Sequence, residues 1–340
     1  MRKLRDKEKS SVDRLRDGPG SVKVETPDDN SNITGMVSFG GTLYAIKEKG
    51  VYRIKMADEI DPERRNINVP NTVQRVLPYG STDDSAGRVF LTGIELLKQD
   101  ILSADIDADY AMGVVLGIAQ SISGAREVAQ SIESSEKNLI EQYDLEIRED
   151  RSVVLPSLVG ISNKCKEFLQ KSDHALTGLW TLANLFYPDI KKGMWDALEE
   201  AVKREEDSPD NFVEVLENDS DFRKFVRNAR NCVEHPREDH RVIVRDFTLD
   251  SDNNLAAPSI EVIHSISPQS LVPVVRLFSS ITDALVGFIE VSLACLCNRK
   301  IRDSIGIPVA VHEFPLASRM NPNVKFGYGV ATRDGLIRFG

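Results

Sequence analysis

The sequence predicts an α+β protein in which a mainly α-helical C-terminal half follows a smaller N-terminal module of strands and helices. Apolar residues recur at spacings of three or four through most of residues 156–300, which is the period of one face of an α-helix. Alternating β-branched and aromatic residues over 42–56 predict a β-hairpin near the start of the chain. A second alternating pattern over 241–266 predicts a hairpin inserted among the helices.

The N-terminal module is expected to span residues 33–150. Residues 1–32 are polar, mixed in charge and rich in Ser, Asp, Gly and Pro, so we expect a disordered tail there. Gly50 suits the turn of the first hairpin because glycine accepts positive φ angles. Residues 61–80 contain three prolines and indicate an extended connector or an irregular loop. Helical periodicity begins near residue 87.

The C-terminal domain is expected to span residues 151–300, and a tail of strands and loops follows over 301–340. The boundary between the two halves is the charged segment 144–154. Helices are expected over 158–186, 194–204, 212–216, 222–233 and 271–296, and the first of these segments can form one long helix or two short ones. Ser220 is a residue type that can cap the helix over 222–233.

Length and charge restrict the kind of protein this is. A chain of 340 residues with 41% hydrophobic residues can form two domains with cores of their own. The net charge of −10 and the pI near 5.2 exclude a protein that coats nucleic acid through its overall field. A local basic patch can still attract nucleic acid, because charges act within a Debye length of about 8–10 Å.

The cysteines and the apolar segments predict a soluble cytoplasmic protein. The four cysteines lie in helical or apolar segments without the spacing of a disulfide framework, and they are Cys165, Cys232, Cys295 and Cys297. The first 17 residues are charged and lack the apolar core of a signal peptide. The most apolar long segment, 271–297, is interrupted by Arg276, Asp283 and Glu290, which argues against a membrane span.

The most informative segment is Arg230–His235, with the sequence Arg-Asn-Cys-Val-Glu-His, followed directly by Pro236. A guanidinium can hold two phosphate oxygens at once, and a histidine can exchange a proton near neutral pH. From Asp221 to Arg245 there are seven basic and four acidic residues, so the segment lies in a region of net charge +3 in an acidic chain. This combination suits chemistry on a phosphate.

Arg230, Asn231 and His235 resemble the signature of the HEPN superfamily, an Arg followed by a polar residue, a few variable positions and a His. The setting among long amphipathic helices also resembles that family. The resemblance implies a HEPN-like helical domain and a metal-independent endoribonuclease without a cofactor, in which two motifs meet at a homodimer interface. It also implies a role in defence or in a toxin–antitoxin system, with an antitoxin or another protein as partner.

The roles of the motif residues follow from the chemistry of RNA cleavage through the 2′-hydroxyl. His235 would act as base or acid, Arg230 would stabilise the charge on phosphorus, and Asn231 would orient the phosphate or His235. Neighbouring basic residues would bind RNA, and these are Arg223, Arg227, Arg237 and Arg241.

The three motif side chains do not converge on a straight helix, since Asn231 and His235 share a face while Arg230 lies at its border. Pro236 biases His235 away from helical geometry, so His235 can turn back at the helix end. Dimerisation is the second way to bring the groups together.

Several alternative interpretations remain open. Arg230 can pair with Glu234 at i,i+4 on a solvated helix face while His235 caps the helix. The domain would then be a non-catalytic helical module that binds RNA, a nucleotide or a protein partner. Two metal sites are disfavoured. A zinc site of Cys232, His235, His240 and His264 has an unusual spacing, and Asp105, Asp107 and Asp109 suit a helix N-terminus better than a metal.

Overall fold

The chain folds into two units, Met1–Asp83 and Asp84–Gly340. The computed structural model describes residues 10–18, 22–190, 195–205, 211–302, 306–333 and 335–339. The mixed α+β class, with a helical core and an N-terminal sheet, is confirmed. The division between the units does not lie at the expected boundary near residue 150. Helices before and after that position pack on one another in the second unit.

The first unit is a four-stranded antiparallel sheet with the strand order β1-β2-β3-β4. Its strands are β1 (Ile33–Phe39), β2 (Thr42–Lys47), β3 (Val51–Lys55) and β4 (Thr72–Leu77). The predicted hairpin is confirmed by the pairing of β2 with β3, in which Ile46 lies opposite Val51. The expected connector over 61–80 was wrong in part, because it contains β4, which pairs with β3 along its length.

Part of the expected disordered tail is also ordered. Residues Ser11–Arg16 form α1, which begins with a capping box of Ser10 and Asp13. Arg16 forms ion pairs with Asp58 and Asp61, near the short helix α2 (Ala57–Ile60), at 2.9 and 3.0 Å. These contacts fix α1 to its own unit. The expectation of disorder for residues 1–9 and 19–21 falls outside the described residues.

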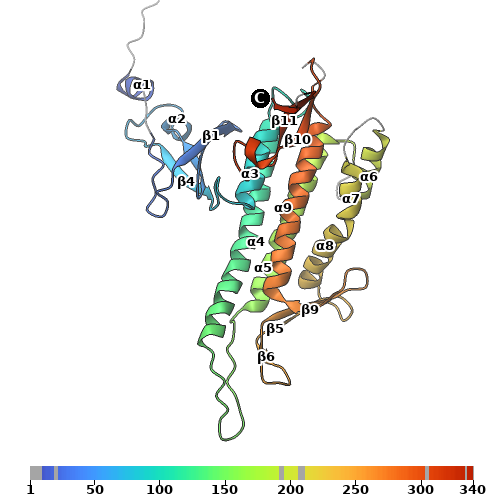
Figure 1. The fold of residues 1–340 in the computed structure, drawn as a ribbon. Helices are drawn as coiled ribbons and strands as arrows, with labels where there is room; N and C mark the ends of the chain where they lie inside the picture. The colour runs from blue at the N-terminus through green and yellow to red at the C-terminus, as the bar shows by residue number, and fades with distance from the viewer. Residues whose placement is uncertain are drawn as a thin grey trace, which may run out of the picture. The chain divides into compact units, whose positions relative to one another are not determined.

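The second unit is built around seven helices in the part of the chain that the structure describes (Figure 1). They are α3 (Ala86–Leu96), α4 (Ala108–Gln142), α5 (Ile161–Phe186), α6 (Trp195–Arg204), α7 (Phe212–Asn218), α8 (Ser220–Glu234) and α9 (Val274–Asn298). Residue 194, the expected start of α6, lies outside the described residues. At the N-terminus of α4, Asp107 accepts a hydrogen bond from the Tyr110 N–H at 2.9 Å, so it is a helix cap.

Helices α4 and α5 form a close pair, and α9 packs against both of them and against α3 (Figure 1). Gly178 on α5 allows the close approach, because a Cβ there would lie 2.6 Å from a side-chain atom of Ile118 on α4. Phe168 and Phe278 stack with ring centroids 3.6 Å apart and join α5 to α9. Of the described helices, only α9 is long and apolar enough to span a membrane, and 61% of its most apolar window is buried in the structure. Its composition is explained by packing inside the unit.

Two small sheets complete the second unit. The predicted hairpin over 241–266 is confirmed, since β5 (Arg241–Arg245) pairs antiparallel with β8 (Ser259–Ile263). The sheet gains a third strand, β9 (Gln269–Pro273), which leads directly into α9. Between β5 and β8 lie the short strands β6 (Thr248–Leu249) and β7 (Leu255–Ala256).

The expected C-terminal tail of strands and loops belongs to this same unit. It forms a three-stranded sheet of β10 (Val309–Glu313), β11 (Phe326–Thr332) and β12 (Gly335–Arg338), with a 3₁₀ turn, η2 (Leu316–Ser318), between the first two strands. Tyr328 is fully buried and donates a hydrogen bond from its hydroxyl group to the Leu96 carbonyl at 2.6 Å. This bond attaches the sheet to the end of α3.

Candidate functional site

Helix α8 carries the motif and packs against α5 and against strands β5 and β8. Its buried stripe includes Val226, Ala229 and Cys232, as expected for an amphipathic helix. The expected Ser220 cap was wrong, because Ser220 is the first residue of the helix and Asp219 precedes it. The packed stripe fixes the rotation of α8, and therefore the directions in which the motif side chains leave it.

His235 ends α8, as its position before Pro236 predicts. Its backbone leaves helical geometry at φ −132° and ψ 62°, while its N–H still donates to the Asn231 carbonyl at 2.8 Å. The residue is exposed. His235 is therefore accessible to solvent just beyond the helix end.

The guanidinium of Arg230 is surrounded by protein oxygens on its own helix and on α5. Nη2 forms an ion pair with Glu234 at 2.8 Å, and Nη1 donates to the Asn231 side-chain oxygen at 3.2 Å. Nε lies 3.6 Å from a carboxylate oxygen of Asp173. Nε is buried and has no hydrogen-bond acceptor among the described residues. The i,i+4 pair of Arg230 and Glu234, which belongs to the alternative interpretation of the motif, is thus present, and a quarter of the Arg230 side chain remains exposed.

Asp173 and Gln170, both on α5, are site residues that the sequence reasoning missed. Asp173 is buried, with 4% of its surface exposed, and also lies 3.6 Å from a guanidinium nitrogen of Arg227. Gln170 donates a hydrogen bond to the second oxygen of Glu234 at 2.9 Å. One signal was available in the sequence, because Asp173 interrupts the apolar stripe of α5 and a buried carboxylate requires a charged or hydrogen-bonding partner.

The pKa of Glu234 is lowered, first by the hydrogen bond from Gln170 and then by the positive charge of Arg230. Glu234 therefore stays ionised at neutral pH. Together, Asp173 and Glu234 offset the charges of Arg227 and Arg230, so the cluster has no net charge in this structure.

Arg223 does not belong to an exposed RNA-binding surface, which corrects the expectation from the sequence. It is 5% exposed, and its guanidinium carbon lies 4.6 Å from the ring centroid of Trp195 and 5.5 Å from that of Phe288. Its Nη2 donates to the Leu216 carbonyl at 2.6 Å. The aromatic rings and the carbonyl hold the charge inside the unit, so Arg223 is a structural residue.

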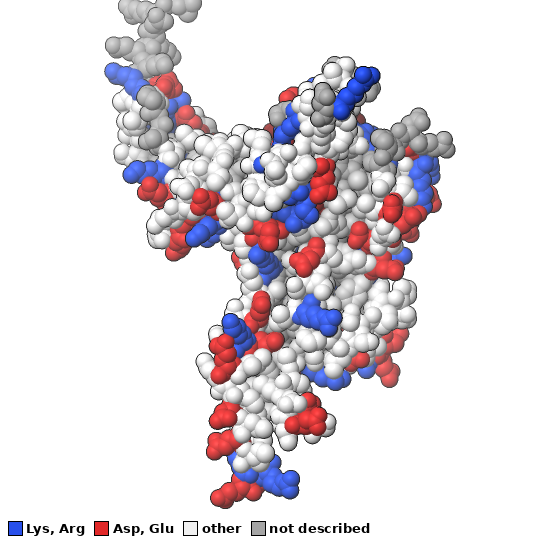
Figure 2. Space-filling model, in the orientation of Figure 1, with Lys and Arg blue, Asp and Glu red and all other residues white. Residues whose placement is uncertain are grey.

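The other three predicted RNA-binding residues remain near the surface. Arg227 has 60% of its side chain exposed, and Arg237 is exposed on the loop after α8. Arg241 is partly buried and donates to the Glu238 carbonyl. Over the face shown in Figure 2, basic and acidic side chains are interspersed, in agreement with the mixed composition of the chain.

The alternative zinc site is not formed, since the described residues contain no group of three His, Cys, Asp or Glu side chains able to hold a metal ion. Cys232 donates weakly to the Ile263 carbonyl at 3.7 Å, and burial raises the pKa of its thiol. The rings of His240 and His264 lie side by side with centroids 4.4 Å apart. His264 accepts hydrogen bonds at Nδ1 from the two backbone N–H groups of Ile266 and Ser267, and burial lowers its pKa.

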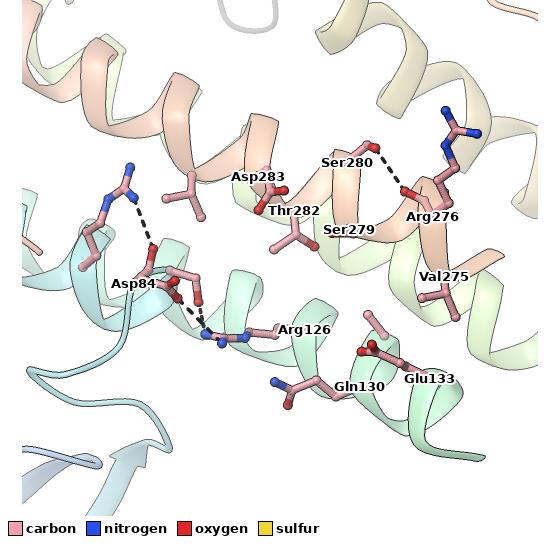
Figure 3. A pocket seen from close by; sticks show the side chains of 14 residues that line it. Asp84, Arg126, Gln130, Glu133, Val275, Arg276, Ser279, Ser280, Thr282 and Asp283 are labelled. Atoms are coloured by element: carbon pink, nitrogen blue, oxygen red, sulfur yellow. Dashed lines mark hydrogen bonds and ion pairs between the residues drawn. The ribbon is translucent and has the colours of Figure 1, made fainter. Parts of the chain in front are cut away.

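A groove of about 740 Å³ lies elsewhere in the unit, between α4, α9 and the start of α3 (Figure 3). Arg126 points toward Asp84, at 3.7 Å, and donates to the Ser85 hydroxyl. Arg88 forms an ion pair with the buried Glu290 of α9. The groove contains none of the motif residues, and two of its arginines, Arg88 and Arg126, already pair with carboxylates of the protein.

No family model matches the chain, and neither the characterised proteins nor the solved structures include a significant match.

Proposed function

We propose that the protein is a metal-independent endoribonuclease of HEPN type, with a HEPN-like helical domain in its second unit. One observation carries this proposal: His235 is exposed just beyond the end of the helix that bears Arg230 and Asn231. Such a placement gives one short segment a proton-transfer group, a phosphate-binding cation and an orienting amide.

The proposed reaction cleaves RNA through attack of the 2′-hydroxyl oxygen on the adjacent phosphorus. A base removes the hydroxyl proton, an acid protonates the leaving 5′-oxygen, and a cation stabilises the negative charge on the equatorial oxygens. His235 serves as base or acid, and Arg230 stabilises the charge. Asn231 orients the phosphate or His235. No cofactor takes part.

One motif supplies one histidine, whereas the reaction uses two proton transfers. A homodimer in which two copies of the α8 end face one another would supply the second His235. Arg227, Arg237 and Arg241 would hold the RNA backbone near this composite site. We place such an enzyme in the cytoplasm, in a defence or toxin–antitoxin setting, with an antitoxin or another protein as regulator.

The second candidate function is a non-catalytic helical module that binds RNA, a nucleotide or a protein partner. The contacts of Arg230 favour it specifically, because Glu234 and Asp173 already occupy the guanidinium. In this function the cluster would be a structural link between α5 and α8, and His235 would only cap the helix.

RNA cleavage in excess EDTA separates the two functions. We predict that His235→Ala and Arg230→Ala each lower the cleavage rate by about 100-fold or more, the usual contribution of a proton-transfer group and of a charge-stabilising group, respectively. Matched controls are His174→Ala, exposed on α5, and Arg204→Ala, exposed on α6; both should cleave like the wild type. Unchanged circular dichroism would show that the variants are folded. Cleavage at the wild-type rate by both motif variants would contradict the proposed site, whereas absence of cleavage by the wild type would contradict the nuclease.

The dimer is tested by light scattering on the full chain at micromolar concentration. We expect the mass of a dimer in the active preparation. A strict monomer that cleaves RNA at the full rate would exclude a site built from two copies of His235.

A further inference from the structure

We propose that Glu234 occupies the phosphate site of Arg230 in the free protein, and that an RNA phosphate displaces it while Asp173 keeps the guanidinium in position. This inference rests on the nuclease function proposed above and concerns the regulation of the same site. The two carboxylates that contact Arg230 have opposite roles, because Glu234 competes with phosphate whereas Asp173 holds the guanidinium in place.

The guanidinium nitrogens of Arg230 face different partners, Nε toward Asp173, Nη2 toward Glu234 and Nη1 toward Asn231. Nε is buried and faces Asp173, whose side chain is only 6% exposed. Nη2 faces Glu234, whose side chain is 21% exposed and lies at the last residue of α8. A phosphate binds arginine through two parallel N–H groups. It can approach only from the exposed side, where the Glu234 carboxylate lies now.

Asp173 is placed to remain where it is. It lies within α5, between Ser172 and Ala175, which are themselves buried in the core. A second arginine, Arg227, lies at the same 3.6 Å distance from its carboxylate. Movement away from Arg230 would leave a buried carboxylate with only one partner, which is costly.

Glu234, in contrast, has other partners within reach. Gln170 already binds its second oxygen at 2.9 Å, and Lys166, one turn earlier on α5, contributes to lowering its pKa. A carboxylate displaced from Arg230 can therefore remain hydrogen-bonded on the surface of α5. Exchange of Glu234 for phosphate costs less than the opening of a buried ion pair would.

The net charge of the cluster gives the exchange a consequence. With both carboxylates in place, Arg227 and Arg230 are neutralised, and the site has little attraction for an anion. Loss of Glu234 leaves one positive charge at the surface, next to the exposed His235. In the free protein Glu234 lowers phosphate affinity, so it restrains cleavage.

The test compares two variants that remove the same charge, Glu234→Gln and Asp173→Asn, with Glu238→Gln as control. Glu238 is exposed on the loop after α8, so its replacement changes the local charge without contact to Arg230. Binding is measured in EDTA with an RNA oligonucleotide carrying 2′-O-methyl groups, which cannot be cleaved through the 2′-oxygen. Cleavage of the unmodified oligonucleotide gives kcat and KM.

We expect Glu234→Gln to bind the modified RNA about tenfold more tightly and to cleave with a lower KM, since it loses a charged hydrogen bond that competes with phosphate. Asp173→Asn should lower kcat by about tenfold, because the guanidinium is no longer held in place. Glu238→Gln should change each quantity by less than about twofold.

The outcomes separate this inference from the nuclease itself. Equal effects of Glu234→Gln and Glu238→Gln on binding would overturn the inference while wild-type cleavage still supports the nuclease. Tighter binding by Glu234→Gln, with no cleavage by the wild type or by any variant, would uphold the exchange at Arg230 and overturn the nuclease. Equal changes in kcat for Glu234→Gln and Asp173→Asn would show only a general charge effect and would overturn the inference.

Discussion

The two ends of α8 place the same residue type in opposite environments. Arg223, in the first turn, lies over the rings of Trp195 and Phe288 and is 5% exposed. Arg230, about two turns later, has a quarter of its side chain exposed and contacts two carboxylates. The helix is continuous between them, so the difference arises from what each end packs against.

The comparison shows which arginine can bind an anion. Burial lowers the pKa of Arg223, and the rings and the Leu216 carbonyl that hold it cannot exchange with a phosphate. Carboxylates around Arg230 resemble phosphate in charge and geometry, so one can replace the other. A count of basic residues along the sequence treats the two arginines alike, although only the side chain of Arg230 is partly exposed.

The largest expected effect is on stability at the buried end. Arg223→Met should lower the free energy of unfolding by about 3 kcal/mol, from the loss of a charged hydrogen bond and two cation–π contacts. Urea unfolding followed by tryptophan fluorescence measures it, because both tryptophans, Trp180 and Trp195, lie in the second unit. The control Arg237→Met, on an exposed loop, should change it by less than about 0.5 kcal/mol. If Arg223→Met also lowered the free energy of unfolding by less than about 0.5 kcal/mol, Arg223 would not be the structural residue that distinguishes the two ends of α8.

A double-mutant cycle sharpens the comparison at the other end. Asp173→Asn and Arg230→Met should be coupled by about 1 kcal/mol in unfolding free energy, because their side chains share an ion pair in a partly buried site. The cycle of Asp173→Asn with Arg223→Met should show coupling within about 0.5 kcal/mol, as expected for residues that share no contact. Equal coupling in both cycles would contradict a specific link between Asp173 and Arg230.

A smaller effect is the loss at acid pH of the stability that Glu234 contributes at the C-terminal end of α8. The pKa of Glu234 is lowered by its hydrogen bond from Gln170 and by nearby positive charges. A folded-state pKa below the unfolded one gives stability that is present above the unfolded value and is lost as the pH falls through the folded value. The difference in urea midpoint between wild type and Glu234→Gln should therefore shrink as the pH falls from about 7 to about 3. A constant difference would mean that Glu234 is not held by these contacts.

The smallest expected effect on turnover concerns the three arginines that remain near the surface around the motif. Replacement of Arg227, Arg237 and Arg241 by Gln should reduce the salt dependence of RNA binding by about two in slope, since each lost phosphate contact releases fewer counterions. Arg223 is omitted because it is buried. Turnover at saturating RNA should fall much less than in His235→Ala, since these charges supply binding alone. An unchanged slope would mean that the three arginines form only a solvated face.

Local features of the fold could be predicted from the sequence, whereas contacts between distant segments could not. The hairpin of β2 and β3 and the pairing of β5 with β8 follow from alternation and turn residues. The strand β4 was missed because its residues lie between prolines. It is stabilised by its pairing with β3, which its own sequence does not indicate. The unit boundary was misplaced because charged residues near 150 mark an exposed loop between α4 and α5, which pack on each other.

For the candidate site, the sequence by itself determined the end of α8 at His235 and the pair of Arg230 with Glu234. Both depend only on residues within one helical turn and on Pro236, so neighbouring residues in the sequence are enough to predict them. Only the tertiary structure decided that Asp173 and Gln170 reach the motif and that Arg223 is buried. These contacts depend on how α5, α6, α8 and α9 are rotated against one another, and that rotation is set by the packing of all their buried stripes together rather than by any one of them.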